Sequence, residues 1–289
     1  MAFLTVCLNP TIQKTLRFSS IVSGAVNRTA FHRLDASGKG INVTRVLTQL
    51  GKKAVHLTQL GGSMRPLFLS LCEQDRMSVE WAESGSQIRF CYTVLNEHDG
   101  SVTELVEESE PVTAGTETLL IDKFDALLAD VSCLIISGTK AAGFSDLIFP
   151  GMVEKAKEKG IRVILDIKGN DLINCLEYKP DIIKPNLEEF TSTFKTELTK
   201  DFLIDLSRKC RCRIILTNGS ENIIAAADGN CFEAEIPSVK AVNTTGCGDA
   251  FTAGLAAELE NGADFYAAIN EGIRCGALNA GLEKPGVIY

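Results

Sequence analysis

Short runs of apolar, largely β-branched residues alternate with amphipathic helical stretches along most of the 289-residue chain. This alternation predicts an α/β protein with a mainly parallel central sheet, because parallel neighbours need a helical crossover between them. The expected strands are 4–8, 54–60, 131–136, 162–166, 182–184, 213–216 and 223–227. The expected helices are 40–50, 145–158, 188–194, 203–209, 249–260 and 265–281.

Two segments, about 13–34 and 88–107, interrupt this rhythm. In the second, strands 90–95 and 102–106 flank Asp99-Gly100, a dipeptide typical of a hairpin turn. We expect the two segments to form a small antiparallel sheet outside the main one. Such a sheet has little to pack against on its own, so a role as a lid or a dimer contact would account for it. No linker-like or repeated segment divides the sequence, so residues 1–289 are expected to form one domain with this lid inserted.

Composition excludes several classes of protein. The net charge of −8 and the pI near 5.1, without any basic run, argue against a nucleic-acid binder. The longest apolar runs, such as 133–136, have the length of a strand and cannot span a bilayer. The N-terminus lacks a basic region typical of a secretory signal, and the ten cysteines include no CxxC pair. We therefore expect a cytoplasmic protein that binds neither nucleic acid nor membrane.

The segment Asn243-Thr244-Thr245-Gly246-Cys247-Gly248-Asp249 directly precedes an amphipathic helical run. Free backbone N–H groups at a helix start form a site for a phosphate or a developing negative charge. A carboxylate beside that site, here Asp249, could take a proton from an attacking hydroxyl. The alternative is a glycine turn followed by an acidic residue in the first helical turn, where carboxylates are favoured anyway. The motif alone leaves both interpretations open.

Three further motifs precede it in order: Leu8-Asn9-Pro10, Ser37-Gly38-Lys39-Gly40-Ile41-Asn42-Val43 and Lys184-Pro185-Asn186-Leu187-Glu188-Glu189. The ordered set resembles the PfkB (ribokinase-like) carbohydrate kinases, and within them the 1-phosphofructokinase and tagatose-6-phosphate kinase branch. The resemblance runs from Thr5 to the C-terminus. It implies an αβα sandwich with a β-sheet lid that often serves as a dimer contact. It also implies transfer of the ATP γ-phosphoryl group to a hydroxyl of a sugar phosphate.

The resemblance also implies roles for individual residues. Asp249 is the base, and the anion hole is formed by Gly246, Cys247 and Gly248, where Cys247 replaces the usual Ala. The sugar phosphate is held by Gly38, Lys39 and Asn42, in a loop that is not a Walker A motif. Arg28 and Arg89 match lid positions that grip the phosphate, a task that suits the planar fork of arginine. For either arginine, a solvated surface charge is the alternative.

On the nucleotide side, Asn186 and Glu189 match the NxxE element of the family, in which Glu189 helps to hold Mg²⁺ through water. The same four residues also fit a helix capping box, and both roles are compatible. The resemblance implies that Lys184, Asn186, Thr217 and Gly219 contact ATP. It places Asn279 near the adenine, the alternative being a polar residue on the exposed face of the last helix.

One departure concerns the sugar. After Leu8-Asn9-Pro10 this branch usually continues with Ala-Ile-Asp, and the Asp binds the sugar hydroxyls; here the residues are Thr11-Ile12-Gln13. A hydrogen bond to a charged group contributes ~1.5–3 kcal/mol, against about 1 kcal/mol for a neutral one. The change from carboxylate to amide therefore predicts a lower sugar affinity or a different ligand.

Three functions remain open at the level of sequence. The first is an ATP-dependent kinase that converts a ketose phosphate of the fructose 1-phosphate or tagatose 6-phosphate class to a bisphosphate. The second is a related kinase for a non-standard acceptor such as a nucleoside, which the cationic residues Lys39, Arg89 and Arg28 argue against. The third is a non-catalytic, sugar-phosphate-binding regulator, which the intact Asp249 motif argues against and Gln13 supports.

Overall fold

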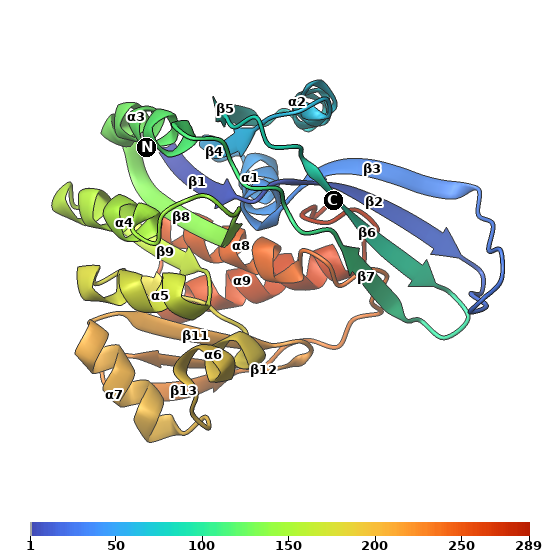
Figure 1. The fold of residues 1–289 in the computed structure, drawn as a ribbon. Helices are drawn as coiled ribbons and strands as arrows, with labels where there is room; N and C mark the ends of the chain where they lie inside the picture. Colours follow the sequence, from blue (N-terminus) through green and yellow to red (C-terminus); the bar gives the residue numbers. More distant parts are fainter. Residues whose placement is uncertain (1) are drawn as a thin grey trace.

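A computed structural model describes residues 2–289. Its main sheet has nine strands in the order β13-β12-β11-β10-β9-β8-β1-β4-β5 (Figure 1). Neighbouring strands run parallel from β5 to β11, and β12 and β13 are antiparallel to their neighbours. The strands are β1 (Ala2–Leu8), β4 (Ala54–Leu60), β5 (Ser78–Glu83), β8 (Val131–Lys140), β9 (Arg162–Asp166), β10 (Ile182–Ile183), β11 (Arg213–Asn218), β12 (Glu221–Ala227) and β13 (Asn230–Ala234).

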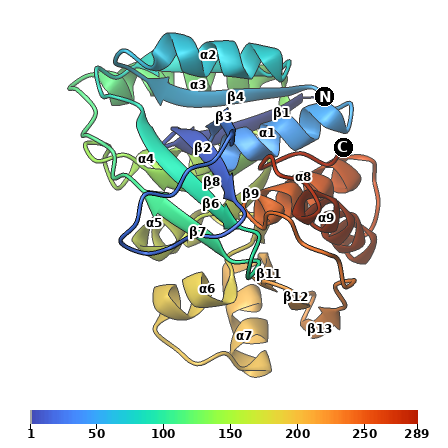
Figure 2. The same ribbon diagram turned by 90° about the vertical axis from the view of Figure 1, so that its right-hand side faces the viewer.

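Helices cover both faces of this sheet, as Figure 2 shows from the side. One face packs against α1 (Lys39–Gln49), α8 (Cys247–Glu260) and α9 (Phe265–Ala280). The other packs against α3 (Thr116–Leu127), α4 (Ile148–Glu158), α5 (Gly169–Cys175), α6 (Leu187–Phe194) and α7 (Lys200–Cys210). The 3₁₀ turns Leu128–Asp130 and Leu176–Tyr178 extend α3 and α5. Successive side chains of a strand point to opposite faces of the sheet. In the buried strand β1, Phe3 therefore packs against α1, α8 and α9, whereas Leu4 and Val6 pack into the core on the other face.

A second sheet of four strands, in the order β3-β2-β6-β7, projects from the main body (Figure 1). Its strands are β2 (Thr11–Phe18), β3 (Phe31–Ser37), β6 (Arg89–Asn96) and β7 (Val102–Val106). The outer pairs are antiparallel and the central pair β2–β6 is parallel. Its base packs through Ile12 and Ile88 against Ile41 of α1 and Phe68 of α2 (Arg65–Gln74). We call these four strands the lid sheet.

The predicted fold class is confirmed: a mainly parallel sheet lies between two helical layers, with a small sheet outside it. Every predicted strand and helix is present, and the lid hairpin has its turn at Asp99-Gly100. Five elements were not predicted, namely β5, β13, α2, α3 and α5. Within residues 2–289 no helix combines the length and the apolar composition needed to cross a membrane.

Candidate active site

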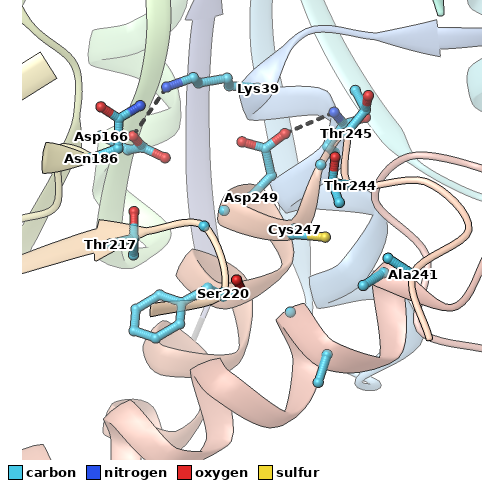
Figure 3. A pocket seen from close by; sticks show the side chains of 18 of the residues that line it. Lys39, Asp166, Asn186, Thr217, Ser220, Ala241, Thr244, Thr245, Cys247 and Asp249 are labelled. Atoms are coloured by element: carbon cyan, nitrogen blue, oxygen red, sulfur yellow. Dashed lines mark hydrogen bonds and ion pairs between the residues drawn. The ribbon is translucent and has the colours of Figure 1, made fainter. Parts of the chain in front are cut away.

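A cavity of about 1180 Å³ opens where the carboxyl ends of the main strands, the start of α8 and the lid sheet meet. This is the edge at which open α/β sheets bind ligands. All but two of the predicted site residues line it: Gln13, Gly38, Lys39, Asn42, Arg89, Lys184, Asn186, Glu189, Thr217, Gly219, Gly246, Cys247, Gly248 and Asp249. Motifs separated by more than 200 residues of sequence therefore face one space (Figure 3).

Asp249 lies in the first turn of α8, and 6% of it is exposed. One of its carboxylate oxygens accepts a hydrogen bond of 2.8 Å from Nδ2 of Asn42. Burial, together with the nearby charge of Asp166, raises the pKa of Asp249 to about 6, against the opposing effects of Lys39 and the Asn42 hydrogen bond. A carboxylate with a pKa in this range can act as a general base near neutral pH.

The turn before α8 is shaped by glycine. Gly246 has φ of 86°, and a Cβ there would lie 2.7 Å from the backbone nitrogen of Gly286. The N–H of Cys247 bonds to Thr244 and that of Ala250 to Gly246, which leaves those of Gly248 and Asp249 without a backbone acceptor in the described chain. A Cβ on Gly248 would point toward Nζ of Lys184, 3.6 Å away. The turn therefore presents two free donors beside a cation, an arrangement suited to a phosphate.

Cys247, the residue between the two glycines, has a neutral side chain. Burial raises the pKa of its thiol to about 12, and its Sγ lies 4.0 Å from the backbone oxygen of Asn243. The thiol is therefore protonated at physiological pH and adds no charge to the turn.

Asp166, at the carboxyl end of β9, belongs to the site although the sequence analysis did not single it out. It is 1% exposed and lies 3.2 Å from Nζ of Lys184 and 3.4 Å from Nζ of Lys39. Burial alone would raise the pKa of Asp166, but the two lysines hold it below its ordinary value. The available signal was its position, since it directly follows a predicted buried strand at the edge that binds ligands.

Asn186 and Glu189 form the predicted capping box at the start of α6. The Asn186 side chain accepts from the Glu189 N–H at 2.7 Å, and Oε2 of Glu189 accepts from the Asn186 N–H at 3.1 Å. The other oxygen, Oε1, lies 3.3 Å from Nζ of Lys39. One carboxylate oxygen thus caps the helix, while the other lies at the cavity and pairs with Lys39 and, at 3.7 Å, with Nζ of Lys168.

Magnesium usually keeps several waters and binds few protein carboxylates. In the described part of the chain, no three acidic, histidine or cysteine side chains group closely enough to hold a metal by themselves. A single carboxylate oxygen of Glu189 facing the cavity, near the turn that presents N–H groups, fits a hydrated Mg²⁺ completed by phosphate oxygens.

The opposite end of the cavity is apolar. Thr217, at the end of β11, and Gly219, which has φ of 59°, form a turn beside it. The walls beyond come from β12, from the loop between β13 and α8, and from α8 and α9, with Ile223, Ile236, Val239, Phe251, Ile273 and Ala280. A slot of this kind suits the flat apolar face of a nucleobase. The loop has no motif, which is why sequence reasoning missed it.

Gln13 and Arg89 line the lid side. Nε2 of Gln13 donates to the hydroxyl of Thr93 at 2.7 Å, which leaves the amide oxygen as the acceptor available to a ligand. Arg89 donates to the backbone oxygen of Glu107 at 2.9 Å and to that of Asn9 at 3.5 Å. Its Nε is buried and has no partner among residues 2–289.

Two predicted site residues lie elsewhere. Asn279 is fully buried, and its Nδ2 donates to the backbone oxygens of Val287 at 3.1 Å and Lys284 at 3.2 Å. It therefore fixes the C-terminal loop beneath Gly246 and is neither an adenine contact nor an exposed polar residue, because this loop folds back over the end of α9. Arg28 is exposed in the loop between β2 and β3, outside the cavity.

Solved structures of similar fold cover nearly the whole chain. Phosphofructokinase-2 from Escherichia coli in complex with fructose-6-phosphate has a TM-score of 0.87 and 22% identity, over 96% of this chain and 93% of its own. A possible 1-phosphofructokinase from Thermotoga maritima has a TM-score of 0.89 and 21% identity, over 100% and 94%. Arabidopsis thaliana ribokinase complexed with ribose and ATP has a TM-score of 0.74 and 17% identity, over 98% and 94%.

The sequence model of the pfkB family carbohydrate kinases matches residues 7–287. This span contains the helix-start turn, its buried carboxylate and both halves of the cavity. The chain therefore belongs to the pfkB family of carbohydrate kinases.

Proposed function

We propose that this protein transfers the γ-phosphoryl group of ATP to a hydroxyl of a ketose phosphate, of the fructose 1-phosphate or tagatose 6-phosphate class, to give a bisphosphate. The observation that carries the proposal is the position of Asp249. It is a buried carboxylate with a raised pKa, next to free N–H donors, in a cavity that also holds a lid arginine. Two solved relatives of the same fold carry phosphofructokinase names, which supports a phosphorylated ketose as the acceptor.

In this mechanism Asp249 accepts the proton of the attacking hydroxyl. The Asn42 hydrogen bond holds the carboxylate in place while the hydroxyl oxygen attacks the γ-phosphorus of ATP. The bond from that phosphorus to the β,γ-bridging oxygen breaks, and ADP leaves. The free N–H groups of Gly248 and Asp249 then receive the transferred phosphoryl oxygens, whose charge they stabilise without reorganising. Catalysis on this account depends on positioning and electrostatics.

Lysines and a metal ion supply the remaining positive charge. Asp166 and Glu189 hold Lys39, and Asp166 also holds Lys184, so both ammonium groups are fixed beside the turn. Burial alone would lower the pKa of Lys39, but the two carboxylates raise it above its usual value, which keeps the residue charged. Bound Mg²⁺, held by Glu189 through water, would neutralise charge on the nucleotide phosphates.

Residues on the lid side support a sugar phosphate, in preference to a neutral acceptor, as the second substrate. Arg89 brings a cation to the cavity, and its planar guanidinium suits the oxygens of a phosphate. A phosphate on the acceptor would pair with this charge, whereas a neutral nucleoside would not. Gln13 beside it offers its oxygen to a sugar hydroxyl. These observations favour a ketose phosphate over a nucleoside.

We also propose a homodimer that forms through the lid sheet. Its outer strand β7 exposes Leu105, and the loop between β2 and β3 exposes Val22 and Val26. Light scattering of wild type and of Leu105→Glu tests this. A monomeric wild type would contradict it.

The variant Asp249→Asn tests the proposed function. It keeps the shape of the side chain and removes the base, so kcat should fall by ~10²–10⁴-fold. ATP binding, measured by calorimetry, should survive. The matched control is Asp264→Asn, at the start of α9, because asparagine caps a helix as well as aspartate and Asp264 lies outside the cavity. A nearly normal kcat in Asp249→Asn would refute the assignment of the base.

A further inference from the structure

Arg45 of α1 is the largest side chain that is almost fully buried, with 1% exposed. The three nitrogens of its guanidinium donate to four acceptors. Nε donates to Asp75 at 2.7 Å, and Nη1 donates to Oδ1 of Asn42 at 2.8 Å and to the backbone oxygen of Pro285 at 3.0 Å. Nη2 donates to the backbone oxygen of Ala36. A buried arginine with every nitrogen bonded is held in one geometry, and one of its contacts is the residue that bonds to the base.

Arg45 can only donate to Asn42, and this determines which way the Asn42 amide is turned. An arginine has no acceptor atom, so the amide of Asn42 must turn its oxygen toward Arg45 and its nitrogen toward Asp249. The other neighbour of that oxygen is the Ser37 hydroxyl, 3.3 Å away, which can donate or accept and therefore tolerates either orientation. We propose that Arg45 is a positioning residue that fixes the orientation of the Asn42 amide and, through it, the hydrogen bond to Asp249.

The same guanidinium also supports the anion-binding turn. It binds the backbone oxygen of Pro285, the residue before Gly286. Gly286 packs so closely on α1 that a Cβ at this position would lie 2.7 Å from Cα of Asn42. On its other side Gly286 meets Gly246, because a Cβ on Gly246 would lie 2.7 Å from its nitrogen. The segment 285–286 is thus wedged between α1 and the turn before α8, and Arg45 ties it to α1 through the backbone oxygen of Pro285.

Charged and titratable groups around Arg45, Asn42 and Asp249 also affect the titration of Asp249, so the test must account for them. Asp75 balances Arg45 and is itself paired with Lys284, which also lies 3.3 Å from Asp35. His56 packs near Arg45, and burial lowers its pKa to about 3, so it is neutral. The remaining groups that face Arg45 or Asp249 are Cys72, Cys7, Cys247, Lys39, Lys184 and Asp166. Replacing Arg45 and Asp75 together by neutral residues leaves the net charge of this region unchanged, so a shifted Asp249 titration in that double variant does not come from a change in net charge.

The inference rests on the proposed role of Asp249 as base, but its test does not require turnover. The Asp carboxyl carbons are labelled with ¹³C and titrated by NMR, and the Asp249 signal is the one lost in Asp249→Asn. In Arg45→Met the freed amide can turn its oxygen toward Asp249, which favours the protonated acid. The Asp249 signal should therefore titrate at higher pH than in the wild type, both in Arg45→Met and in Arg45→Met/Asp75→Asn.

Three comparisons make the result decisive. Asp75→Asn alone should not raise the pH at which the Asp249 signal titrates. Arg45→Lys keeps a side chain that donates and cannot accept, so in this variant the signal should titrate close to the wild-type pH. Where the enzyme turns over, kcat of Arg45→Met should fall by about 10²-fold, because a small misplacement at the base is enough. KM for ATP should change little.

An unchanged Asp249 titration in a folded double variant would overturn the inference, and so would an equal rise in Asp75→Asn alone. Failure of the wild type to phosphorylate any ketose phosphate would instead refute the proposed function, and the NMR titration would still decide the role of Arg45.

Discussion

Glu104 of the lid strand β7 accepts a hydrogen bond of 2.8 Å from the hydroxyl of Thr245, in the turn that precedes Asp249. A second contact, between Arg17 of β2 and Glu283 of the C-terminal loop, joins the same two parts of the molecule. The lid sheet is thus fastened directly to the segment that surrounds the proposed anion site. Opening the lid must break both contacts.

Loss of the first contact should weaken sugar binding and admit water. A hydrogen bond to a charged group is worth ~1.5 kcal/mol or more, so Glu104→Ala should raise KM for the ketose phosphate by about tenfold. Uncoupled ATP hydrolysis should increase, because a closed lid excludes water from the transferred group. The control is Asp99→Ala at the exposed hairpin turn. Equal kinetics for Glu104→Ala and wild type would show that the contact does not hold the lid.

The pH dependence of kcat/KM for the sugar, which reports ionisation before the sugar binds, should have an acid limb near pH 6. Asp249 acts as a base only when it is unprotonated, and burial raises its pKa to about 6. Activity should therefore be full above this pH and fall tenfold per pH unit well below it. Steady-state rates between pH 4.5 and 8.5, with ATP saturating and the sugar well below its KM, measure this limb. A limb near pH 4, the ordinary range of an exposed aspartate, would mean that the base is not the buried Asp249.

Arg89 should act on the sugar phosphate more than on ATP. Arg89→Met removes the lid cation, so KM for the ketose phosphate should rise by tenfold or more while KM for ATP stays within about twofold. Lys14→Met is the matched control, since Lys14 is a cation on the neighbouring lid strand outside the cavity. Equal increases in both KM values would place the Arg89 contact on the nucleotide instead.

The fold could be predicted from sequence wherever the pattern was local. The strands 54–60 and 162–166 and the helix at 265–281 are marked by periodic apolar residues and were found within a residue. Helix α2 was missed because Pro66 in its first turn resembles a loop signal, although proline is tolerated there. Strand β5 lies at the edge of the sheet and exposes Ser78, Glu80 and Glu83, so it lacks the apolar run of a buried strand.

Site residues could be predicted where they belong to a short sequence motif, but not where tertiary contacts bring them to the site. Asp249 and the capping box of Asn186 lie within short patterns. Asp166, Arg45 and Glu104 owe their positions to partners far away in sequence, at Lys184, Asn42 and Thr245. Asn279 could not be placed correctly because its burial depends on the C-terminal loop folding back over α9. Packing between distant segments is therefore what sequence reasoning lacked.

Gln13 is expected to limit sugar affinity. Its amide nitrogen is engaged by Thr93, so a ligand meets a neutral oxygen where a carboxylate would bind hydroxyls more strongly. Gln13→Asp should raise the affinity for a ketose phosphate by up to about tenfold, equivalent to ~1.4 kcal/mol, as measured by calorimetry. Thr93→Val, which frees the amide to rotate, should lower it. Weaker binding by Gln13→Asp would mean that the natural ligand presents an acceptor to the amide nitrogen.

The central claim is that the cavity transfers phosphoryl from ATP to a ketose phosphate with Asp249 as base. The most direct measurement is ³¹P NMR of the wild type with Mg²⁺, ATP and, in turn, fructose 1-phosphate, fructose 6-phosphate, tagatose 6-phosphate, fructose and adenosine. The account predicts equal amounts of ADP and a ketose bisphosphate with at least one of the three phosphorylated sugars, and no product with Asp249→Asn. Transfer confined to fructose or adenosine, or no transfer to any of the five, would contradict it.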